Sequence, residues 1–245
     1  MRAPTIRARG FILAVMTCVY SAGALAQESA YASLDACTKD EQIRLTAKGA
    51  ALGMVTGLGG ALFSGKKDKA LKAGVIGAVA GGAAGFATAY YTAIDNCNKK
   101  NPQWITESSL VRDPSRNYKQ VKKEHGYQAN EGVKVHLNDV VVPASVQPGE
   151  RFAIDTVFDL MTPTDAEAEV QFQRKLFVTT DGQEKEMPFP SASSATRVVE
   201  AGRSKETIQL PTPPDAIKGT TYRIEISAAA GGKPPAMLSR SVSVI

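Results

Sequence analysis

The segment Val133-Lys-Val-His-Leu-Asn-Asp-Val-Val-Val142 decides the fold of the C-terminal half, because apolar and polar side chains alternate along it until Pro143. A period of two places the apolar side chains on one face of a β-strand, and His136 is then expected to face solvent on the other. Similar short runs follow toward the C-terminus, around residues 152–160, 170–178, 198, 208–210, 222–226 and 242–244. Asp181-Gly182, which follows one of these runs, is typical of a hairpin turn.

These runs predict an antiparallel β-sandwich over residues 131–245. About seven short strands in about 115 residues are the pattern of immunoglobulin-like domains, which this part of the chain resembles. The paired cysteines and core tryptophan of antibody domains are missing from it. The resemblance implies a domain that binds or spaces other molecules. Its candidate binding edges, with plain surface loops as the alternative, are residues 188–190, 211–214 and 231–235.

The preceding residues, 98–130, are polar and poor in aromatic side chains, and we expect a linker there. One exposed helix is predicted near residues 116–124, and His125 is expected to be solvated. The basic residues of this segment are Lys99, Lys100, Arg112, Arg116, Lys119, Lys122 and Lys123.

Two ladders of glycine, each with a spacing of four, precede the linker. Gly49, Gly53 and Gly57 form the first, and Gly77, Gly81 and Gly85 form the second. A spacing of four places small residues on one face of a helix, where two helix backbones can approach closely. A polar turn containing Lys66, Lys67 and Lys69 separates them. Residues 38–97 are therefore predicted to form an antiparallel α-helical hairpin, and the whole chain to be α+β in separate parts.

So many interior glycines weaken a helix by about 0.5–1 kcal/mol each relative to alanine, so the ladders need a packing partner. That partner is the other helix or another subunit, and lipid is a candidate medium around them. Residues 73–94 carry no charge and would span about 33 Å as a helix, whereas residues 49–63 would span about 22 Å. Membrane insertion and a water-soluble helical oligomer both remain open.

The two ladders around a short polar turn resemble the glycine-zipper two-transmembrane domain of Gram-negative envelope proteins. The resemblance covers about residues 45–95. It implies a role in envelope integrity or assembly, with no chemistry attached. The chain differs from lipoprotein members of this group, because Val15-Met16-Thr17 before Cys18 is a poor lipidation motif.

A disulfide between Cys37 and Cys97 is expected at the open end of this hairpin. Cys37 lies thirty positions before Lys67 and Cys97 thirty positions after it, so an antiparallel pair with its turn near Lys67 brings the two cysteines together. An even pair of cysteines in an exported chain is typical of a disulfide.

Residues 1–26 have the features of a signal peptide. Arg2, Arg7 and Arg9 form a basic start, an apolar run follows, and Ala24-Leu25-Ala26 is a cleavage site that leaves residues 27–37 as a polar leader. An uncleaved anchor helix is the alternative. Removing these residues lowers the formal net charge from +5 to +2, which provides no electrostatic basis for nucleic-acid binding.

The residues outside these features offer little for catalysis. His125 and His136 are the two histidines, and no phosphate-binding or calcium loop is recognisable. We therefore expect a non-enzymatic protein without cofactor or metal, exported and associated with the inner or outer membrane. Membrane lipid, copies of itself and an unknown envelope protein are its expected partners. The alternative functions are an oligomeric pore or secretion component and, less favoured, a hydrolase using surface carboxylates.

Overall fold

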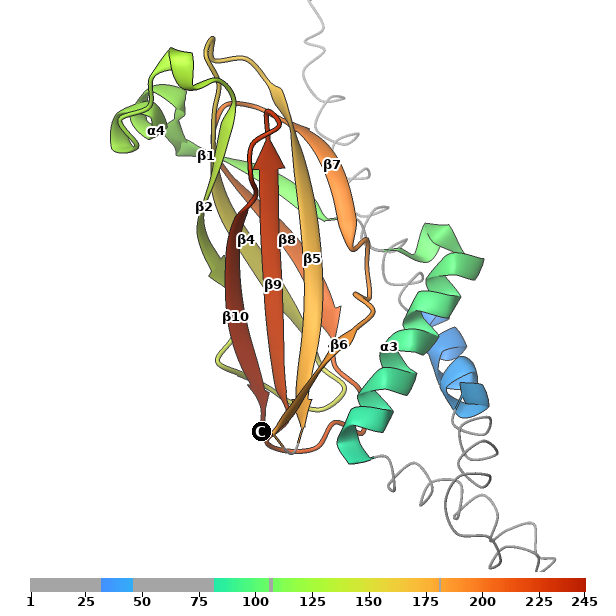
Figure 1. Ribbon diagram of the computed structural model, residues 1–245. Helices are drawn as coiled ribbons and strands as arrows, with labels where there is room; N and C mark the ends of the chain where they lie inside the picture. Colours follow the sequence, from blue (N-terminus) through green and yellow to red (C-terminus); the bar gives the residue numbers. More distant parts are fainter. Residues whose placement is uncertain (1–31, 46–81, 106–107, 181) are drawn as a thin grey trace, which may run out of the picture.

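A computed structural model describes residues 32–45, 82–105, 108–180 and 182–245 and is dominated by two facing β-sheets (Figure 1). The signal peptide with Cys18, the turn lysines Lys66, Lys67 and Lys69, and the ladder glycines Gly49, Gly53, Gly57, Gly77 and Gly81 lie outside the described residues. The strands are β1 (Ser109–Asn117), β2 (Lys134–Val141), β3 (Ser145–Val146), β4 (Arg151–Met161), β5 (Ala168–Thr180), β6 (Gln183–Met187), β7 (Ser194–Val199), β8 (Gly202–Pro211), β9 (Thr221–Ala230) and β10 (Ala236–Val244). The labelled helical elements are α3 (Gly82–Lys100), η1 (Pro102–Trp104), α4 (Tyr118–Glu124) and η2 (Ala129–Glu131).

The predicted immunoglobulin-like sandwich is confirmed. One sheet has the antiparallel order β1-β8-β4-β2. The other has the order β3-β10-β9-β5, and β6 and β7 both pair with β5. The apolar runs that predicted strands lie in β2, β4, β5 and β7 to β10, with Val133 and Val142 just outside β2, and the strands before and after Asp181-Gly182, β5 and β6, pair antiparallel.

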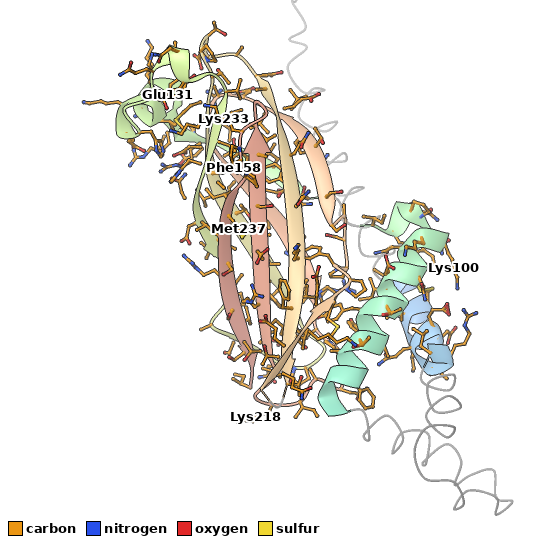
Figure 2. All side chains as sticks on the ribbon, in the orientation of Figure 1. Lys100, Glu131, Phe158, Lys218, Lys233 and Met237 are labelled. Atoms are coloured by element: carbon orange, nitrogen blue, oxygen red, sulfur yellow. A yellow bond between two sulfur atoms is a disulfide. The ribbon has the colours of Figure 1, made fainter. Side chains whose placement is uncertain are left out.

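Alternation along each strand produces the core between the sheets. In β5 the buried positions are every second residue from Val170 onward, and the neighbouring strand β9 of the same sheet follows the same rule except at Ser227, which is also buried. The rings of Phe158 on β4 and Phe172 on β5 meet edge to face between the layers, with centroids 5.1 Å apart (Figure 2 labels Phe158). Such aromatic pairs add about 0.5–1.5 kcal/mol beyond the burial of their surface.

The prediction of a linker over residues 98–130 is wrong. α3 continues to Lys100, and β1 is an edge strand that pairs antiparallel with β8. The strand was hidden because its residues are exposed or only partly buried, so no alternating apolar pattern marks it. The predicted helix near 116–124 is present as α4, where Asn117 and Gln120 form a capping box and Val121 is buried.

The predicted disulfide between Cys37 and Cys97 is confirmed, with the two Cα atoms 6.1 Å apart. It joins α3 to a helix over residues 32–45, and Lys100 on α3 also pairs with Glu41 on that helix at 2.8 Å. Gly85, the one ladder glycine within the description, is partly buried on α3, and its packing role stays a prediction. Among the described residues, no helix is both long and apolar enough to cross a membrane.

The described helices and the sandwich are not separate parts, which corrects the predicted architecture. Leu34, Tyr91 and Ile94 are buried in the same core cluster as the apolar residues of both sheets. The hydroxyl of Tyr91 donates to the carbonyl oxygen of Pro211 at 3.0 Å. α3 lies along the edge formed by β6 (Figure 1). Tyr90 and Tyr91, in the middle of α3, thus provide a packing face that the glycine pattern alone did not reveal.

Candidate functional site: an arginine-lined pocket

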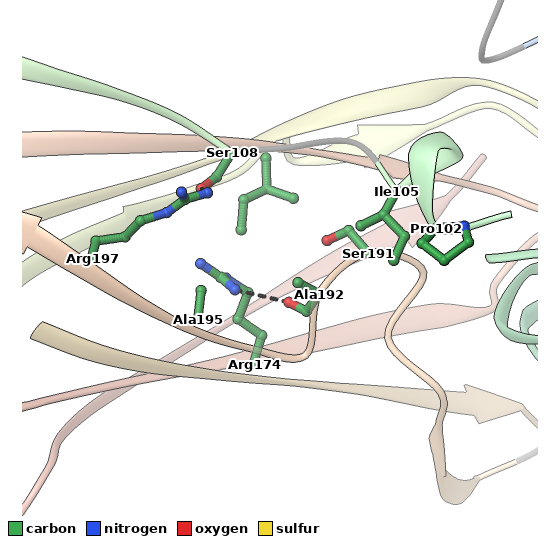
Figure 3. Close-up of a pocket in the computed structure, with 9 residues that line it drawn as sticks. Pro102, Ile105, Ser108, Arg174, Ser191, Ala192, Ala195 and Arg197 are labelled. Carbon is green, nitrogen blue, oxygen red and sulfur yellow. Dashed lines mark hydrogen bonds between the residues drawn. The ribbon is translucent and has the colours of Figure 1, made fainter. Parts of the chain in front are cut away.

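A pocket of about 270 Å³ lies where the edge of the β3-β10-β9-β5 sheet is interrupted. β6 ends at Met187 and β7 begins at Ser194, and both pair with β5. Pro188 and Pro190 lie in the gap, and proline has no backbone N–H to donate to a neighbouring strand. The pocket is lined by Pro102, Ile105, Ser108, Arg174, Ser191, Ala192, Ala195, Arg197 and Ile208 (Figure 3).

Arg174 of β5 and Glu206 of β8 form an ion pair that bridges the two sheets. Their side chains are 2% and 1% exposed, and Nη2 of Arg174 donates to both carboxylate oxygens, at 2.7 and 2.8 Å. Nη1 donates to the carbonyl oxygen of Ala192 at 2.8 Å (Figure 3). The hydroxyl of Ser108 donates to Oε1 of Glu206 at 2.6 Å. Glu206 therefore neutralises Arg174 inside the protein.

Arg197 of β7 brings a second guanidinium to the same pocket (Figure 3). Its Nη2 is 3.4 Å from the hydroxyl of Ser108, which is a long contact, and within the described ranges it forms no ion pair. The Nε atoms of Arg174 and Arg197 are both buried without a hydrogen-bond partner in the described part of the chain. The pocket lining thus holds two guanidinium groups, and Glu206, which lies outside the lining, pairs with Arg174 alone among the described residues; this arrangement favours an anion.

A second polar cluster lies on the β1-β8-β4-β2 sheet, around Asp159. This carboxylate is fully buried, accepts two hydrogen bonds from Arg203 at 2.8 Å each, and lies 2.8 Å from Nε2 of His125. Burial raises the pKa of Asp159, but the hydrogen bonds from Arg203 and the contact with His125 outweigh it and hold the pKa below its usual value of 3.8. The expectation that His125 is simply solvated is wrong, because β1 and α4 bring it against β4.

His136 is exposed, as expected, and its ring lies 4.7 Å from that of His125. Desolvation lowers the pKa of His136 below 6.5, and His125 lowers it further.

We expect the NMR titration midpoint of His136 to lie below 6.5, and the substitution His125→Gln to raise that midpoint by removing a like charge. Arg240→Gln is the control, because Arg240 pairs with Asp139 and is not among the charged groups that shift the pKa of His136. The His136 side chain binds a proton more readily in the unfolded chain than in the folded one. The free energy of unfolding therefore decreases as the pH falls from about 6.5 toward the lowered pKa of the folded state. An unchanged midpoint in His125→Gln would contradict the assignment.

Sequence reasoning located the disulfide but missed the arginine pocket. A usable signal was present, because Arg174 is in phase with the buried residues Phe172 and Leu176. Glu206 is likewise in phase with Ile208 and Leu210 on β8. Opposite charges at inward-facing positions of two strands predict a buried ion pair between sheets. Across the described ranges, no cluster of three histidine, cysteine or acidic side chains is arranged to hold a metal.

Solved structures similar to this chain include immunoglobulin-like sandwich domains. The CARDB domain of a Pyrococcus furiosus protein, solved in complex with di-metal ions, matches 47% of this chain and 90% of its own, with 13% identity and a TM-score of 0.32. A PapD-like domain of human CEP192 matches 46% and 82%, with 14% identity and a TM-score of 0.28. A family 123 glycoside hydrolase from Clostridium perfringens matches 57% of this chain and 27% of the enzyme, with 12% identity and a TM-score of 0.32. No family model and no curated protein matches the sequence.

Proposed function

We propose that this protein is an exported, non-enzymatic component of the bacterial cell envelope. Its sandwich binds a partner, and its glycine-spaced segment associates with membrane lipid or with other copies of the chain. The observation that carries the proposal is the disulfide between Cys37 and Cys97. Disulfides persist in oxidising compartments, and the signal-like residues 1–26 supply a route to one.

The position of the disulfide also supports an anchoring or assembly role for the ladders. All six ladder glycines lie between Cys37 and Cys97, inside the ring that the disulfide closes. Both helices that carry these cysteines contact the sandwich, through the Arg151–Asp35 ion pair and the hydrogen bond from Asn98 to the carbonyl oxygen of Pro190. The glycine-spaced segment thus starts and finishes at fixed points on the binding domain.

The chemistry of the pocket supports binding over catalysis. Guanidinium groups stay protonated at physiological pH, so Arg174 and Arg197 can orient a charged group but cannot accept its proton. The carboxylate of Glu206 already accepts hydrogen bonds from Arg174 and Ser108. Such a site is suited to holding an anionic group in one orientation.

The proposal is tested by fractionating a Gram-negative host that expresses the full chain. We expect a product beginning at Gln27 whose thiols resist alkylation until a reductant is added. It should stay with the membranes after a carbonate wash. A chain lacking residues 2–26 is the control for export, and it should remain reduced in the cytoplasm.

A second variant separates the anchoring role from export. Residues 46–81 are replaced by a glycine-serine linker of equal length, which keeps both cysteines and the whole described structure. This variant should be exported and oxidised but released by the carbonate wash. A wild-type protein that is reduced in the cell, or that the wash releases as readily as the linker variant, would overturn the proposed function.

A further inference from the structure

We infer that the arginine-lined pocket is a carboxylate-binding site, which takes an aliphatic carboxylate such as the C-terminal residue of a partner chain. This inference rests on the proposed binding function and deepens it by naming the ligand chemistry. It starts from the two arginines of the pocket lining: Glu206, behind the lining, compensates Arg174, and Arg197 has no carboxylate partner among the described residues.

The unpaired N–H donors indicate that the ligand of the pocket is a hydrogen-bond acceptor. Nε of Arg174 and Nε of Arg197 are buried without a hydrogen-bond partner among the described residues, and the Arg174 side chain is 2% exposed. Buried polar groups in native proteins are nearly always paired, so a pair of unsatisfied cationic donors beside one pocket indicates a bound acceptor. The hydroxyl of Ser108 donates to Glu206 and lies 3.4 Å from Nη2 of Arg197, so both arginines lie close to the same side chain.

The charge and size of the site favour a carboxylate over a phosphate. Among the described residues, one positive charge at the pocket is left uncompensated, which matches a singly charged carboxylate, and the planar guanidinium matches the geometry of its two oxygens. The volume of about 270 Å³ is smaller than that of most small-molecule sites, which are roughly 300–1,000 Å³. It suits the end of a chain better than a nucleotide.

The remaining walls indicate what the carboxylate is attached to. Pro102, Ile105 and Ile208 line the pocket together with Ala192 and Ala195. Apolar walls around a charged end favour an aliphatic group next to the carboxylate, because burying that group is favourable and burying a polar one is not. A C-terminal leucine and a free branched-chain acid share this chemistry.

The test uses the mature, oxidised chain and calorimetric titration with four probes. These are N-acetyl-Gly-Gly-Leu with a free carboxylate, the same peptide as its C-terminal amide, 3-methylbutanoate and inorganic phosphate. We expect the free-acid peptide to bind at least tenfold more tightly than its amide and than phosphate. If 3-methylbutanoate binds as tightly as the free-acid peptide, free acids are identified as the source of the carboxylate. If 3-methylbutanoate binds more weakly than the free-acid peptide, the C-terminal end of a partner chain is identified as the source.

Variants assign the binding to this pocket. Arg197→Gln should weaken the free-acid peptide at least tenfold. Ala195→Leu should do the same by filling the pocket without removing a charge, which covers the case in which Arg197→Gln fails to fold. Arg112→Gln is the matched control, because Arg112 is half-exposed on β1 and pairs with Glu200 outside the pocket lining. It should bind like the wild type.

Three outcomes would overturn the inference: no binding of the free-acid peptide to the wild type, equal binding of acid and amide, or equal binding of phosphate. All these measurements use purified protein, so their failure is independent of export and membrane retention.

Discussion

Replacing Cys37 and Cys97 together by alanine is expected to lower the free energy of unfolding by about 2–4 kcal/mol. The disulfide closes a ring with a sequence separation of 60 residues. Loop-closure entropy for a ring of that size corresponds to roughly 4 kcal/mol as an upper estimate. The helix over residues 32–45 should respond most, because a helix this short is marginal in water without tertiary contacts.

Trp104 provides the measurement for this prediction. It is the single tryptophan, follows α3 directly, and packs against the core cluster that the helices share with the sandwich. Its fluorescence in urea should show a lower midpoint for the double variant than for the oxidised wild type. Adding reductant should lower the wild-type midpoint to the same value and leave the variant unchanged. Hydrogen exchange should rise over residues 32–45 before it rises in the central strands. Coinciding midpoints for all samples would refute the prediction.

The sandwich could be predicted because its strands obey a simple rule of burial. Each inner strand has one buried face, so Phe152 and Ile154 on β4, or Ile224 and Ile226 on β9, recur with a period of two. The disulfide could be predicted because a turn expected midway between Cys37 and Cys97 would bring the two cysteines together. Neither inference needed knowledge of which elements contact each other.

The features that sequence reasoning missed all depend on contacts between distant elements. β1 is an edge strand with little buried surface, so its pairing with β8 leaves almost no trace in the apolar pattern. His125, at the end of α4, reaches Asp159 only because α4 packs against β4. The arginine pocket needs the gap between β6 and β7, the residues after α3 and an inward-facing charge on each sheet. No single segment contains that combination.

Substituting Glu206 by glutamine is expected to cost about 3–5 kcal/mol of stability, because it leaves Arg174 buried without its counter-charge. Both side chains are at most 2% exposed, so water cannot reach the guanidinium of Arg174 to replace the lost carboxylate. Asp139→Asn is the matched control: it breaks the Arg240–Asp139 pair, whose side chains are 48% and 46% exposed. Exposed pairs contribute about 0–1 kcal/mol, and the control should change stability by no more than that. Urea unfolding of the purified variants measures both effects.

The double variant Arg174→Met, Glu206→Leu separates the charge from the packing and keeps the prediction testable if Glu206→Gln does not fold. Replacing a buried ion pair by apolar side chains of similar size is often neutral or stabilising, so the double variant should recover most of the loss. It would still leave the carbonyl oxygen of Ala192 and the hydroxyl of Ser108 without their present partners, and a residual cost of about 1–2 kcal/mol is expected from them. If Glu206→Gln instead lowers the free energy of unfolding by less than about 1 kcal/mol, the prediction is wrong. Arg174 would then already be solvated or paired with another anion, since a buried guanidinium without a partner destabilises the fold by more than that.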